Sequence, residues 1–197
     1  MPSLQKYKQT YKHGPYRVTF LNAPISFAEN AGQLETMLRP YCSDCCPTEE
    51  RYPLASDILD GPWLIVDHVV KGRNKPPTPV GLMLLDPMGS EIKKIHLRGG
   101  YGKKPAPEKA KIIEAMLGAI ATCLNGHECA GAYVGSVYWP TENLDEDTIQ
   151  AALAAFKGTE EPPVNPAERT DGLLCFDFNS GTGTIPVQSI DVKLDQS

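Results

Sequence analysis

The sequence predicts an α/β protein in which strands alternate with helices, with an antiparallel meander in the first half of the chain and a β-hairpin at the C-terminus. Segments of alternating apolar residues are interspersed with segments whose apolar residues recur at helical spacing. The composition, 41% hydrophobic and 22% charged, is typical of a globular protein. A length of 197 residues suits one domain, which we expect at residues 16–197 after a flexible polar arm at residues 1–15.

The first half of the chain predicts a strand, one or two helices and three further strands. Residues 16–22 alternate a tyrosine, a valine and a phenylalanine on one face, as a strand does. A helix at Phe27–Arg39 follows, with Ser26 and Glu29 in the spacing of a capping box. The remaining elements are a short helix at 54–61 and strands at 63–72, 79–87 and 90–97, which we expect to form an antiparallel meander.

The second half predicts a helix, a strand, a second helix and the terminal hairpin. The helix at 107–124 carries one apolar stripe, begins with a proline and is closed by an Asn-Gly pair. A strand at 130–139 comes next, and then a helix that begins near Asn143 and is closed by a glycine. Alternating segments at 173–179 and 184–192, joined by the sequence SGTG, predict the hairpin.

The charge balance and the cysteines limit the partners and the compartment. A net charge of −5 argues against nucleic acid as a partner. No apolar run is long enough to cross a bilayer, so we expect no membrane partner. The chain opens without the apolar core of a signal peptide, and six irregularly spaced cysteines indicate reduced thiols. We therefore expect a cytoplasmic protein, and a homodimer remains possible.

A glycine-rich segment stands between the strand at 90–97 and the helix at 107–124. Gly99, Gly100 and Gly102 let the backbone approach a ligand closely, and the helix that follows favours negative charge at its N-terminus. Arg98 and Lys103 add positive charge. The segment therefore suits a phosphate or pyrophosphate, although a simple solvent-exposed turn would have the same composition.

Element order and this segment together resemble the general-control-type N-acetyltransferase (GNAT) superfamily. There, a [QR]-x-x-G-x-[GA] loop follows the fourth strand; residues 97–102 match both glycines but carry Leu97 in place of Gln or Arg. The resemblance implies a GNAT-like domain in which helices cover both faces of a mixed, mostly antiparallel sheet. Acetyl-CoA would be the cosubstrate, held in a cleft where the strands at 91–97 and 130–139 run parallel and splay apart. The residues it assigns to the cofactor are Ile95, Leu97, Arg98, Gly99, Gly100, Tyr101, Gly102, Lys103 and Asn143.

The same resemblance implies direct attack of an amine, from a small molecule or a protein, on the thioester. His96 is the best local base, because an imidazole titrates near neutral pH. Tyr138 could protonate the thiolate, since Phe156 stands where the superfamily usually has a tyrosine. A histidine that fills a sheet face, a core aromatic and a helix N-cap are the structural alternatives for His96, Tyr138 and Asn143.

Two other interpretations compete with an acyltransferase. A zinc site could use a C-x-x-C pair, but the pair His127 and Cys129 is too closely spaced, so we expect no metal. A non-catalytic GNAT-like or other α/β module that binds a protein partner is the main alternative. The altered motif and Phe156 favour that module, whereas the strand, glycine segment and helix favour the enzyme.

Overall fold

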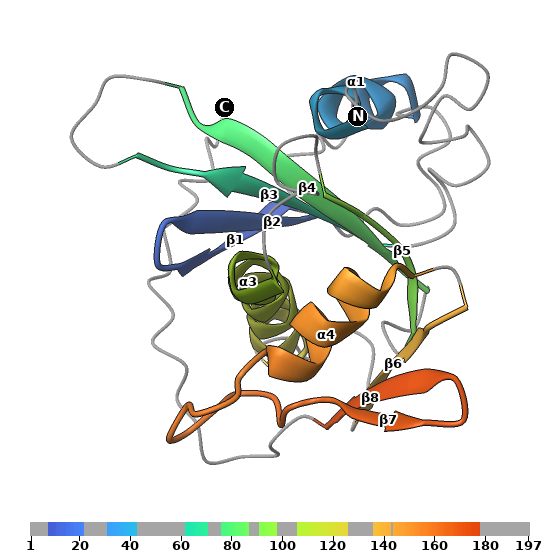
Figure 1. Ribbon diagram of the computed structural model, residues 1–197. Coiled ribbons are helices and arrows are strands. Elements are labelled where there is room, and N and C mark those ends of the chain that lie inside the picture. The colour runs from blue at the N-terminus through green and yellow to red at the C-terminus, as the bar shows by residue number, and fades with distance from the viewer. Residues whose placement is uncertain are drawn as a thin grey trace.

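The computed structural model describes residues 8–21, 31–42, 62–70, 76–86, 91–97, 106–125, 136–142 and 144–177. Within these ranges, eight strands form two antiparallel sheets and three helices pack on them (Figure 1). The five-stranded sheet contains, in order, β1 (Lys8–His13), β2 (Tyr16–Leu21), β3 (Trp63–His68), β4 (Thr78–Leu85) and β5 (Ile92–Leu97). The three-stranded sheet has the order β6 (Ser136–Pro140), β8 (Leu173–Asp177) and β7 (Glu168–Thr170). The helices are α1 (Ala31–Cys42), α3 (Ala106–Asn125) and α4 (Glu146–Ala154).

The larger sheet is covered on both faces, as the GNAT resemblance implies. Figure 1 shows α1 on one side of the sheet and α3 with α4 on the other. Successive strand residues point to opposite faces, so Val18 and Val66 pack in the core that α3 and α4 cover. Leu21 and Trp63 belong to the second core, beneath α1. The central strands are therefore apolar on both sides, which explains their continuous runs of buried residues.

The meander and the long helix are confirmed. β2, β3, β4 and β5 pair antiparallel in chain order. The predicted helix at 107–124 is α3, and the residues of its apolar stripe are buried. The C-terminal hairpin is also present, but β7 and β8 form it, through a turn at Asp171 and Gly172. β8 pairs with β6 on its other edge, and the predicted second strand at 184–192 lies outside the described residues.

The polar arm expected at residues 1–15 is wrong for its second part, because residues 8–13 are β1. This strand pairs with β2 along its whole length, and Tyr11 packs against the core beneath α3. A Cβ atom added at Gly118 in α3 would lie 2.8 Å from the Tyr11 hydroxyl oxygen. The helix backbone therefore passes close to the Tyr11 ring. Strand pairing and this packing order a segment whose local sequence is polar.

The helix boundaries also differ from the prediction. α1 continues past Arg39 to Cys42, with Pro40 inside it, because Leu38 and Tyr41 are both buried beneath the helix. The expected start at Phe27, its capping box and the short helix at 54–61 lie outside the described residues. α4 has Asp145 as its N-cap, not Asn143: the Asp145 side chain accepts a hydrogen bond from the Thr148 N–H.

Candidate functional site

The junction between the two sheets is the feature that the sequence predicts as the site. β5 and β6 meet at a parallel bridge between Glu91 and Tyr138, and each strand then belongs to a different sheet. Two hydrogen bonds between Glu91 and Asp86, the residue after β4, hold the start of β5 in place. The Glu91 N–H donates to Asp86 Oδ1 at 2.8 Å, and the Asp86 N–H donates to the Glu91 carbonyl at 2.9 Å. The bridge thus joins the two sheets at the N-terminal end of β5, and β6 ends at Pro140, two residues after Tyr138.

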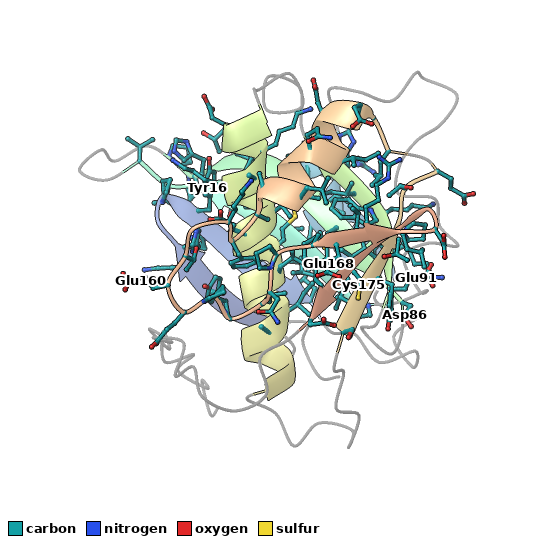
Figure 2. The ribbon with its side chains drawn as sticks, turned by 60° about the horizontal axis from the view of Figure 1, so that its bottom comes forward. Tyr16, Asp86, Glu91, Glu160, Glu168 and Cys175 are labelled. Carbon is teal, nitrogen blue, oxygen red and sulfur yellow. The ribbon has the colours of Figure 1, made fainter. Side chains whose placement is uncertain are left out.

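A row of four residues crosses this junction from sheet to sheet. Glu91 bridges Tyr138, Tyr138 pairs with Cys175, and Cys175 pairs with Glu168, and three of the four are labelled in Figure 2. Tyr138 is 44% exposed, whereas its neighbours Val137 and Trp139 face the core. Lys93 donates to Glu91 Oε1 at 2.8 Å. Burial, followed by the neighbouring Asp177 carboxylate, raises the pKa of the Cys175 thiol, so this thiol is poorly suited to act as a nucleophile.

β5 presents its predicted site residues on two different faces. Ile95 and Leu97 are half-buried and pack against the core beneath α3. His96, also half-buried, lies opposite Leu82, whose side chain belongs to the core beneath α1. The approach to β4 is close here, because a Cβ at Gly81 would lie 2.6 Å from the His96 carbonyl oxygen. β5 is therefore held firmly along its β4 edge.

The two predicted catalytic residues do not converge. Tyr138 is level with Glu91, and His96 is five residues further along β5. At about 3.3 Å per residue, this separation is roughly 16 Å along the strand. General acids and bases act within hydrogen-bond reach of the reacting atom, so His96 and Tyr138 cannot serve the same atom directly.

The first turns of α3 and α4 lie together. Lys109 in α3 has only 3% of its side chain exposed, and its Nζ is 3.6 Å from Oδ1 of Asp145. Both oxygens of Asp145 also accept from Thr148, at 2.8 Å from its N–H and 2.8 Å from its hydroxyl. Burial works to raise the pKa of Asp145, but these hydrogen bonds and the Lys109 ammonium outweigh it and hold the pKa below its usual range.

Sequence reasoning missed Lys109 as a residue of the site. Its signal was its place on the apolar stripe of the helix: Ile113 and Met116, four and seven residues further on, are buried on the same side. A charged residue in such a stripe is rare, and a buried lysine usually has a partner of opposite charge. The spatial proximity to Asp145 could not be read from the sequence, because it depends on how α4 packs against α3.

The remaining predicted site residues lie outside the part of the chain that the structure describes. They are Arg98, Gly99, Gly100, Tyr101, Gly102, Lys103 and Asn143. Phe156 is described: it is only 4% exposed, takes a positive φ of 62° and donates its N–H to Glu114. Among the described residues, no group of three or more metal-ligating side chains could hold a metal ion.

Comparison of the chain with protein-family models, with curated proteins and with solved structures gave no match. None of the described helices combines the length and the apolar character that a membrane span requires.

Proposed function

We propose that the protein is an acyltransferase that moves an acetyl or other acyl group from coenzyme A to an amine acceptor. The observation that carries the proposal is the junction at Glu91 and Tyr138, where parallel strands meet at one bridge and continue in separate sheets. The GNAT resemblance implies that the cofactor lies between two such strands. β5 leads through the glycine segment to α3, a 20-residue helix whose N-terminus favours an anion.

The chemistry is a direct transfer without a covalent enzyme intermediate. The amine nitrogen attacks the thioester carbonyl carbon, an N–C bond forms, and the C–S bond breaks to release the thiolate. His96 is the proposed base for the amine proton, and it acts directly or through one water molecule. Because Tyr138 is level with the start of β5, solvent is the proposed source of the proton that the thiolate takes up. The acceptor is an amine-bearing small molecule or protein.

A non-catalytic binding module with the same fold is the second candidate. The distance between His96 and Tyr138 favours the binding module. Phe156 favours it too, because this buried side chain has no hydroxyl, whereas the superfamily usually has a tyrosine there. Binding of coenzyme A without turnover would distinguish this candidate from the enzyme.

The test is a thermal-shift and calorimetric titration with coenzyme A. A ligand that binds only the folded protein must raise the melting temperature. Gly102→Asp should lower the affinity about tenfold to a hundredfold, because it adds a like charge beside the pyrophosphate. Gly99→Ala, which adds only a methyl group, should cost less.

Gly14→Asp is the matched control, since it makes the same charge change in the exposed turn between β1 and β2. A Cβ at Gly14 meets no atom within 4 Å, and aspartate tolerates its positive φ of 55° better than most residues do, so the strain of this control is small. If the parent protein shows no shift with coenzyme A at millimolar concentration, the acyltransferase proposal fails. If Gly102→Asp binds as tightly as Gly14→Asp, the glycines only turn the chain.

A further inference from the structure

One end of the larger sheet exposes a group of apolar side chains. Val70, two residues after β3, is 43% exposed, and Pro76 and Pro77, just before β4, are exposed too. The turn between β1 and β2 adds the exposed Pro15. A group of exposed apolar side chains marks an interaction surface, whereas single scattered ones do not.

These side chains come from neighbouring strands and their turns. The Val69 N–H donates to the Pro15 carbonyl at 2.8 Å, so the turn between β1 and β2 lies beside the end of β3. His68 pairs with Thr78, so the residues that follow His68 and those that precede Thr78 start from adjacent points on β3 and β4. We call this surface the proline patch; it consists of Pro15, Val70, Pro76 and Pro77.

The prolines before β4 also have a spacing that partner proteins recognise. Pro76 and Pro79 stand in a P-x-x-P sequence, and polyproline II has three residues per turn, so prolines at this spacing lie on one side of the chain. Proline fixes its own φ and keeps the preceding residue extended, so such a segment loses little entropy when a groove binds it. Prolines at this position also end strand pairing, but that role does not account for the exposure of Val70.

The charge at this end of the sheet is positive, although the whole chain carries −5. Lys12 is exposed on β1. The carboxylate of Asp67 is already paired with Arg17 at 2.6 Å. That of Glu114 is paired with His13 at 3.2 Å. The connection from β3 to β4 has the sequence KGRNK, which adds three basic residues and no acidic one. An acidic surface is therefore attracted to the proline patch.

We propose that the proline patch binds a proline-reading domain of a partner protein, of the SH3 type, with an acidic margin beside its groove. Aromatic side chains line such grooves and bind P-x-x-P segments by contact with the proline rings, here those of Pro76 and Pro79. Val70 and Pro15 extend the apolar contact beside the groove. A second copy of this chain is the poorer occupant, because it would bring two positive ends together. None of these residues is assigned to coenzyme A, so the inference does not depend on the proposed function.

The test measures binding of the full chain to an array of purified SH3 domains, followed by calorimetric titration with the domain that binds best. The affinity should fall as the salt concentration rises, because charge contributes to it. Pro76→Ala with Pro79→Ala should weaken binding about tenfold or more, because the groove loses both rings. The matched control is Pro163→Ala with Pro166→Ala, which removes the same spacing from a segment that follows two glutamates. It should change the affinity less than about twofold.

Each outcome decides whether this end of the sheet is the binding surface. If no SH3 domain binds the parent with a Kd below about 100 μM, the inference is wrong. It is also wrong if the control pair weakens binding as much as the pair at Pro76 and Pro79. Val70→Ser keeps every proline and should weaken binding about threefold or more, because it removes apolar contact area. If the proline variant does not fold, an affinity in Val70→Ser equal to that of the parent overturns the inference instead.

Discussion

Arg17→Met should destabilise the protein more than Asp67→Asn, although both variants break the same ion pair. Arg17 Nη2 donates to Asp67 Oδ2 at 2.6 Å, and the Tyr41 hydroxyl donates to Oδ1 at 2.9 Å. The pair joins β2 to β3 on the face that α1 covers, since Tyr41 belongs to α1. Burial and then the neighbouring Asp67 carboxylate raise the pKa of Tyr41, so its hydroxyl remains a donor.

The expected order follows from the unequal exposure of the two partners. The Asp67 side chain is 7% exposed and that of Arg17 is 36% exposed. Arg17→Met keeps most of the packing volume but leaves a buried carboxylate with one hydrogen bond, which should cost about 3 kcal/mol. Asp67→Asn leaves a guanidinium whose side chain is 36% exposed, although its Nε is buried, and this change should cost about 1 to 2 kcal/mol. The double variant Arg17→Met with Asp67→Leu should recover part of the loss, because it buries no charge.

Urea unfolding of the four proteins at neutral pH and one salt concentration measures these differences, provided that the slope against urea is unchanged. If Asp67→Asn costs as much as Arg17→Met, the exposure of the guanidinium does not control the energetics of the pair. If the double variant is less stable than either single variant, the two side chains hold the sheet by packing and not by charge.

Three further predictions concern backbone and side-chain contacts. Gly81→Ala should cost about 1 to 3 kcal/mol, because the methyl group would meet the rigid His96 carbonyl at 2.6 Å. Gly118→Ala should stay within about 1 kcal/mol of the parent, since it meets the end of a tyrosine side chain and gains helix propensity; thermal melts in the reverse order would contradict the close approach of β4 and β5. Glu114 accepts from His13 Nε2 at 3.2 Å, and this hydrogen bond, against the opposing effect of burial, leaves its pKa lowered. The ionised Glu114 carboxylate therefore stabilises the folded protein fully above an unfolded-state pKa of about 4.3. This stabilisation is lost as the pH falls through the lower folded-state pKa of Glu114. The stability difference between the parent and Glu114→Gln should accordingly shrink as the pH falls below about 4.3, and a difference that grows in that range would refute this. Asp171→Ala should cost about 1 kcal/mol and Asp171→Asn less, because the φ of 47° suits asparagine better than alanine; equal melting temperatures would count against the hairpin turn.

The apolar runs at 63–72 and 79–87 were enough to predict the central strands of the meander, because helices cover both faces of the sheet and such strands are apolar along most of their length. β1 was missed because its burial depends on a distant partner: Tyr11 finds its place only when Gly118 of α3 approaches it. The β7–β8 hairpin did have a local signal, the pair Asp171 and Gly172, whose positive φ values suit a tight hairpin turn. No strand was expected before this pair, since the preceding residues 159–170 are rich in proline.

The site was less predictable than the fold, because it depends on register. The GNAT resemblance implied that β5 and β6 are neighbours, but it could not show that Tyr138 is level with Glu91 and not with His96. A shift of a few residues in that pairing would bring the two side chains together. In the same way, the contact between Lys109 and Asp145 arises from the packing of two helices whose sequences carry no mark of each other.

The strand order has a consequence for how the chain assembles during synthesis. In the larger sheet, every strand pairs with the one made just before it, so this sheet can form as the chain emerges from the ribosome. Among the described residues, β6 is linked to an earlier strand by the single bridge between Tyr138 and Glu91, and β8, which pairs with β6 along its length, is made only after α4 and β7. Until then, Val137 and Trp139 lack Phe176 and Leu174, the residues that lie opposite them. The last described strand therefore completes the fold, and a nascent chain that stops before β8 exposes the apolar face of β6 to aggregation and to chaperones.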